Sequence, residues 1–108
     1  MAYCEDTDVK ALLQLETEDE TLDDVIAAAI TSADALIDSL LAPYGLTVPT
    51  TVPQNILDAS ARFAAWIIRR NADPVGAEAF YAEAQRFLQA YIDSNEESAG
   101  PTFSVGSA

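Results

Sequence analysis

One stretch, residues 21–43, constrains the fold of this chain more than any other. At about 100° per residue, the apolar side chains of residues 22–42 gather on one broad stripe, and the acidic side chains gather opposite. This separation predicts an amphipathic helix from Leu22 to Ala42. The stripe contains Leu22, Val25, Ile26, Ala29, Ile30, Ala33, Leu36, Ile37, Leu40 and Leu41, and the opposite side contains Asp23, Asp24, Thr31, Asp34 and Asp38.

The residues around this helix predict how it ends and what it packs against. Thr21 followed by Asp24 approximates a capping box at the start, and Pro43 and Gly45 end the helix. A seam of small residues lies beside the stripe, and it would let a second backbone approach closely, in this chain or in a neighbouring copy. The seam consists of Ala28, Ser32, Ala35 and Ser39.

Three further helices are predicted, over residues 8–15, 53–70 and 74–93. The proline-rich stretch 42–53 should cross the domain in an extended form, because its prolines and threonines disfavour a helix. Asp73 followed by Pro74 is a strong helix start, and the short turn before it makes the last two helices an antiparallel hairpin. The third helix is so apolar that it must be sandwiched within the domain or covered by another subunit. The fold class is therefore all-α, a small four-helix bundle-like domain.

The chain divides into a helical domain, residues 1–93, and a tail, residues 94–108. The tail is rich in small and polar residues, so we expect it to be disordered in isolation. Phe103 and Val105 are two apart in this background, a spacing that suits addition of an extended segment to a partner.

Composition excludes several kinds of chemistry. The chain has no histidine and one cysteine, Cys4, which rules out zinc sites and histidine-assisted nucleophilic catalysis. The acid-rich stretch 16–24 lacks the ligand spacing and central glycine of a calcium loop. We expect no cofactor, no metal and no enzyme activity. No apolar run approaches the ~20 residues of a membrane span and no export signal is present, so a cytoplasmic location and no membrane partner are expected.

The net charge of −13 argues against direct binding of nucleic acid. An acidic surface could instead solubilise the protein, mimic DNA to occupy a basic protein, or line a passage through which DNA slides without sticking. A modification site at Ser39, in a triplet like that of acyl carrier proteins, is a third and weaker hypothesis, because this serine lies late in a helix.

The four arginines all lie in the last two predicted helices. Asp58 and Arg62 should form a pair one helical turn apart. We expect some of the arginines to meet acids of a neighbouring copy, since a guanidinium binds carboxylates in a bidentate fashion. Trp66, beside them, is either a core residue or an interface anchor. The candidate interface residues are Arg62, Trp66, Arg69, Arg70, Arg86, Phe103 and Val105.

The order of these features resembles the head–tail connector (adaptor, or head-completion) proteins of tailed bacteriophages and their Mu-like relatives. The resemblance covers about residues 3–93 and lies in the helix pattern with a few short matches. The segments that match are 8–13, 22–26, 33–41, 47–53 and 56–68.

The resemblance implies a ring, commonly of twelve copies, beneath the portal protein in the virion neck. Such a ring extends the DNA channel and binds the next neck or tail protein (a stopper or tail terminator), and it is assembled in the host cytoplasm. DNA would pass through without specific binding. The alternative is an acidic DNA mimic or regulatory protein that sequesters a basic host factor.

Overall fold

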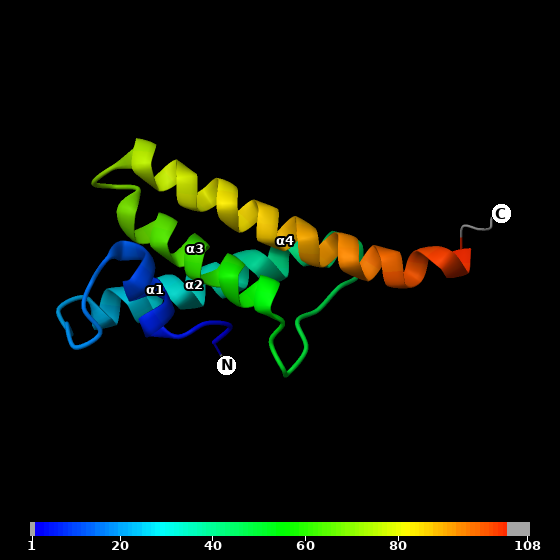
Figure 1. Ribbon diagram of the computed structural model, residues 1–108, viewed down its shortest axis with the longest axis horizontal. Coiled ribbons are helices and arrows are strands. Elements are labelled where there is room, and N and C mark those ends of the chain that lie inside the picture. Colours follow the sequence, from blue (N-terminus) through cyan, green and yellow to red (C-terminus); the bar gives the residue numbers. More distant parts are fainter. Residues whose placement is uncertain (1, 104–108) are drawn as a thin grey trace.

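Four α-helices and one 3₁₀ turn make up the computed structural model, which describes the backbone of residues 2–103 and the side chains of residues 2–95. The elements, shown in Figure 1, are α1 (Asp6–Leu13), α2 (Asp23–Leu41), the 3₁₀ turn η1 (Ala42–Tyr44), α3 (Gln54–Arg69) and α4 (Pro74–Phe103). No strand occurs in the described part of the chain. The predicted all-α fold with four helices is confirmed.

Helix α3 lies at the centre of the domain and packs against each of the other three helices. α4 returns antiparallel along α3 after a short turn, as predicted, while α1 and α2 cover other sides of it (Figure 1). The apolar surface of α3 is therefore sandwiched within this chain. Of the two predicted alternatives, burial within the domain or cover by another subunit, the structure shows the first. Its buried side chains are Ile56, Ala59, Ser60, Ala61, Phe63, Ala64 and Ala65.

Helix α2 buries one side against this core through Ile26, Ala29, Ile30, Ala33, Ile37 and Leu41. Val25, which the periodicity assigned to the same stripe, is instead 48% exposed, because it lies at the edge of the contact with α3. The segment Asp23–Tyr44 is long and apolar enough to cross a membrane by length and composition alone. That test is also met by core helices of soluble proteins, and the buried side of α2 packs against α3.

The seam of small residues on α2 stays exposed at Ala28, Ser32, Ala35 and Ser39. Ala28 and Ser32, half of the seam, border the end of α3, and contact of the seam with a neighbouring copy stays a prediction.

The first two helices begin differently from the prediction. α1 starts at Asp6 rather than Asp8, because the Glu5 N–H donates to Asp8 Oδ2 at 2.8 Å in a capping box, and it ends at Leu13, before Gln14 in the left-handed region. The expected box of Thr21 with Asp24 does not form. The Thr21 N–H donates instead to Asp19 Oδ1 at 2.9 Å, and Leu22 precedes α2 without a side-chain cap.

Helix α4 starts as predicted, with the Gly76 N–H donating to Asp73 Oδ1 at 3.0 Å. It continues to Phe103, so the predicted end at Asp93 is ten residues too early. The first part of this extension, residues 94–99, contains no glycine or proline, and adding a residue to an existing helix costs far less than nucleating a new one. Residues 104–108 of the predicted tail lie outside the described residues.

The proline-rich crossing lies against the domain, as predicted. Leu46, Val48 and Val52 pack against the core, and the Tyr91 hydroxyl of α4 donates to the Thr47 carbonyl at 3.1 Å.

The only lysine of the chain holds the acidic loop, residues 14–22, between α1 and α2. Lys10 is 3% exposed, and its Nζ lies 3.0 Å from the Thr17 carbonyl oxygen, 2.9 Å from Asp23 Oδ1 and 3.6 Å from Asp6 Oδ2. The bond to Asp23 is the main reason that the pKa of this ammonium is raised. One buried cation thus joins α1 to the middle of the loop and to the start of α2, a role not predicted from the sequence.

We predict that Lys10→Met loosens the acidic loop, since the methionine keeps the buried length of the side chain but loses its donors. Limited digestion with a glutamate-specific protease should cut the variant after Glu16, Glu18 or Glu20 several times faster than the wild type. Arg86→Met, a change at an exposed cation far along α4, serves as the control and should not alter the rate. Equal cleavage of Lys10→Met and wild type would contradict the role assigned to Lys10.

Candidate interaction surfaces

Two of the five basic side chains are paired inside the chain. Besides Lys10, Arg62 of α3 places Nε 3.0 Å from Glu83 Oε1 on α4 and a terminal guanidinium nitrogen 3.7 Å from Asp58 Oδ1. Its guanidinium carbon also lies 4.7 Å from the centre of the Phe87 ring. The predicted Asp58–Arg62 pair is confirmed. Because these contacts join α3 to α4, Arg62 has a stabilising role within one subunit.

The other three arginines make no ion pair with any described residue. Arg70 and Arg86 are exposed and Arg69 is half-buried. Arg69 is the last residue of α3 and Arg70 follows it, so two adjacent guanidinium groups lie at the turn that leads into α4. In a chain with 18 carboxylates, the charges of these three cations are thus not compensated by a close ion pair within the described residues.

Trp66 lies between the core and the surface. Its ring is 4.8 Å from that of Tyr81 on α4, and Tyr81 in turn meets Phe63 edge-on at 5.6 Å. The guanidinium of Arg70 lies 4.7 Å above the Trp66 ring, in cation–π geometry. The tryptophan is therefore an α3–α4 packing residue that also supports Arg70, and its half-buried side leaves part of it accessible to a partner.

A polar network that the sequence analysis missed ties the N-terminal segment to α2 and α3. The Tyr3 N–H donates to Asp34 Oδ2 at 3.0 Å, and the Ser60 hydroxyl donates to Asp34 Oδ1 at 2.7 Å. The Tyr3 hydroxyl donates to Asp38 Oδ1 at 2.5 Å. Asp34 was assigned to the solvated side of α2, and this is wrong, since the N-terminal segment covers it and burial raises its pKa. Helical periodicity could not predict that Asp34 is covered by Tyr3, which lies 31 positions earlier in the sequence.

Cys4 belongs to the same network and is 4% exposed. Its Sγ lies 3.3 Å from Ser60 Oγ, and burial raises the pKa of the thiol to about 11. A thiol held in this protonated form is a poor nucleophile.

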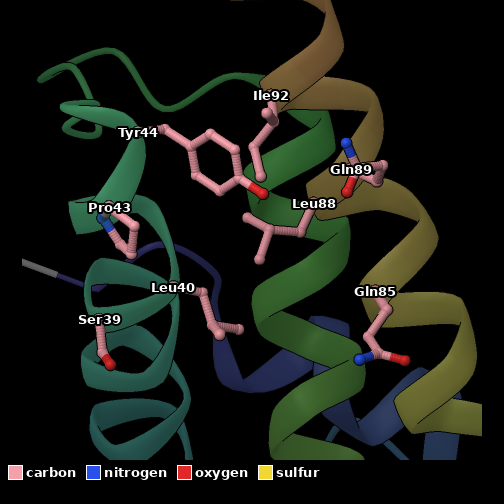
Figure 2. Close-up of a pocket in the computed structure, with 8 residues that line it drawn as sticks. All are labelled: Ser39, Leu40, Pro43, Tyr44, Gln85, Leu88, Gln89 and Ile92. Atoms are coloured by element: carbon pink, nitrogen blue, oxygen red, sulfur yellow. The ribbon is translucent and has the colours of Figure 1, made fainter.

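An apolar groove lies between the end of α2 and the middle of α4. In Figure 2, Tyr44 of η1 points toward Leu88 and Ile92 of α4, and Leu40 lies below it. Ser39, Gln85 and Gln89 form an uncharged border, so none of the residues that line this groove is charged. Tyr44 is 50% exposed.

A second groove lies between the first half of α2 and the end of α3. It is lined by Val25, Ala28, Ala29, Ser32, Ile67, Ile68 and Asn71. It therefore brings half of the exposed seam next to partly buried isoleucines of α3.

Of the two candidate residues in the tail, Phe103 is the last residue of α4, but its side chain lies outside the described residues, as does all of Val105. Among the described residues, no group of three or more cysteine, aspartate or glutamate side chains could hold a metal ion.

The surfaces described so far are those of a small, acidic, helical protein whose core is complete within one chain. A family model described as "Bacteriophage Mu, Gp36" matches residues 1–97, which is nearly the whole described chain. The chain belongs to the bacteriophage Mu Gp36 family. A search of curated proteins and a search of solved structures gave no match.

Membership of the Gp36 family makes this a phage protein. The match spans α1, α2, α3 and most of α4, and it includes Arg69 and Arg70 at the α3–α4 turn. It therefore takes in every surface described above except Phe103 and Val105.

We predict that two substitutions of Asp34 affect stability at pH 7 in opposite ways, and that the effect of Asp34→Asn depends on pH. Because burial raises its pKa in the folded state, Asp34 contributes stability while it is protonated, and that contribution is lost as the pH rises through the folded-state pKa. Asp34→Asn can still accept from Tyr3 and donate to Ser60, so it should match or exceed wild-type stability at pH 7 and lose this advantage toward pH 4. Asp34→Ala should lose about 1–3 kcal/mol at pH 7, because it leaves buried donors unpaired.

Urea denaturation of the three proteins at pH 7 and pH 4.5 measures these differences. Equal destabilisation by Asn and Ala at pH 7 would contradict the account of this network.

A second pair of variants distinguishes the internal arginine from an exposed one. Arg62→Ala should lower the free energy of unfolding by about 1 kcal/mol, since it removes a partly exposed ion pair and a cation–π contact. Arg86→Ala, which breaks no ion pair with a described residue, should leave stability within about 0.5 kcal/mol of wild type. The measurement is chemical denaturation in low salt. An equal loss in both variants would show that the Arg62 contacts carry no stability.

Proposed function

We propose that this protein is a structural component of the virion, a ring that joins the capsid portal to the tail and extends the DNA channel. Its partners would be further copies of itself, the portal protein, and a neck or tail protein such as a stopper or tail terminator. The observation that carries the proposal is the match to a phage family over residues 1–97, on the same helices that resemble head–tail connectors.

The charge distribution supports a role beside passing DNA. The net charge is −13, and the exposed carboxylates of the acidic loop include Glu16, Glu18 and Glu20. Like charge keeps a phosphate backbone from adhering to a channel wall, so DNA can move through a ring of such subunits without specific binding.

The packing supports a subunit that folds first and assembles afterwards. The apolar face of α3 is covered by α1, α2 and α4, so the fold does not need a partner to complete its core. What remains for partners is the surface: two grooves, the exposed seam, and the arginines of the α3–α4 turn, Arg69 and Arg70, which have no ion pair with a described residue. We therefore place the subunit contacts on these features.

The acidic surface also suits the alternative, a DNA mimic or regulatory protein that sequesters a basic host factor. A mimic needs carboxylates at regular spacing along one face. Here Asp34 is covered, Asp23 is bound to Lys10 and Asp38 accepts from Tyr3, so α2 does not present a regular acidic row. This favours the connector.

The proposed role is not catalytic. The polar cluster of Cys4 with Ser60 and Asp34 holds its thiol protonated, which is the reverse of what a nucleophilic cysteine requires.

A deletion in a phage or inducible prophage that encodes this chain tests the proposal. Electron microscopy of the lysate should show DNA-filled or emptied heads and complete tails that are not joined, and supplying the gene in trans should restore joined particles. Mass spectrometry of purified wild-type virions should detect the chain in several copies per particle. Normal joined virions from the deletion, or a chain found only with a basic host protein, would overturn the proposal.

A further inference from the structure

Two surfaces of opposite charge lie on opposite sides of one end of the molecule. The acidic loop and the α3–α4 turn are at the same end in Figure 1, on either side of the packed helices. The turn carries Arg69 and Arg70, neither of which has a carboxylate partner among the described residues. The loop carries Glu16, Glu18 and Glu20, all exposed.

Both surfaces are held in place by contacts within the chain. Lys10 holds the acidic loop at the Thr17 carbonyl and the start of α2 at Asp23, with distances of 3.0 and 2.9 Å. At the turn, Arg70 lies over Trp66, which is itself packed on Tyr81. Preorganised charges lose less conformational entropy when a partner binds than freely moving side chains do.

We infer that the arginine pair of the α3–α4 turn binds the acidic loop of a second copy of this chain. The inference rests on the proposed function and names the subunit contact of that ring. A contact between two different surfaces on identical subunits is heterologous, and repetition of such a contact generates either a closed ring or an open filament.

The charge of the chain favours a second copy over other anionic partners. DNA would have to approach a protein with a net charge of −13, which repels its phosphates. An identical subunit instead offers the carboxylates of its acidic loop to the Arg69–Arg70 pair. The planar guanidinium groups can each bind a carboxylate in a bidentate manner, which sets the orientation of the neighbour as well as its affinity.

The arginines also have a lesser role within their own subunit. Cations at the C-terminus of α3 interact favourably with the helix dipole, so a double reversal removes some stability by itself. The test therefore needs a readout that depends on the partner surface and not only on the loss of the arginines.

Charge exchange between the two surfaces supplies that readout. One variant carries Arg69→Glu with Arg70→Glu, and a second carries Glu16→Lys, Glu18→Lys and Glu20→Lys. Native mass spectrometry and light scattering of the full-length chain, at low salt and in a series of protein concentrations, measure assembly. Arg86→Glu is the control for an unpaired arginine outside the proposed contact.

We expect the wild type and Arg86→Glu to assemble and each surface variant alone to remain monomeric. A mixture of the two surface variants should form mixed assemblies, because the glutamates at the turn of one variant can bind the lysines in the loop of the other. Added salt should weaken wild-type assembly, as expected for exposed charges. Thermal unfolding monitored by circular dichroism confirms that each variant is folded.

Wild-type-like assembly of the arginine variant, failure of the mixture to assemble, or a wild type that is monomeric at every concentration would each overturn the inference. These results leave the proposed function to be decided by the deletion and by the composition of the virion. Loss of head–tail joining together with normal assembly of the arginine variant would retain the connector and discard this contact.

Discussion

The position of α3 at the centre of the domain is the constraint on which the rest of the structure depends. Its apolar residues spread over most of its circumference, so they can be buried only if other helices cover several sides. α4 covers one side after a turn of a few residues, α2 covers a second, and α1 covers a third. Partners can therefore bind only the surfaces that the packing of α1, α2 and α4 on α3 leaves exposed.

Periodicity was enough to predict α2 and α4, because one buried side per helix leaves a clear 3.6-residue pattern, and the apolar residues of α3 indicated a helix covered on several sides. The antiparallel hairpin followed from the short turn before the helix start at Asp73 and Pro74. Periodicity could not predict that Asp34 is covered or that Lys10 is buried. Both depend on segments that lack a regular pattern, the N-terminal residues before α1 and the acidic loop, folding back over a helix. For the same reason the sequence could not show whether a partner or this chain covers α3.

The contacts separate the candidate interface residues into those that pack within the chain and those that are free to bind a partner. Arg62 and, in part, Trp66 contribute to α3–α4 packing, whereas Arg69, Arg70 and Arg86 have no ion pair with any described residue. Sequence spacing alone could show the Asp58–Arg62 pair but not the Glu83 contact, which links residues on different helices. The inferred subunit contact thus depends on Arg69 and Arg70, whose guanidinium groups have no carboxylate partner in the part of the chain that the structure describes.

A map of the neck in virions that contain this chain tests the central claim most directly. The account predicts a ring of these helical subunits between portal and tail, with the packing of α1 to α4 preserved and carboxylates facing the DNA path. Density at the neck that the four helices do not fit, or virions that lack the chain, would contradict it.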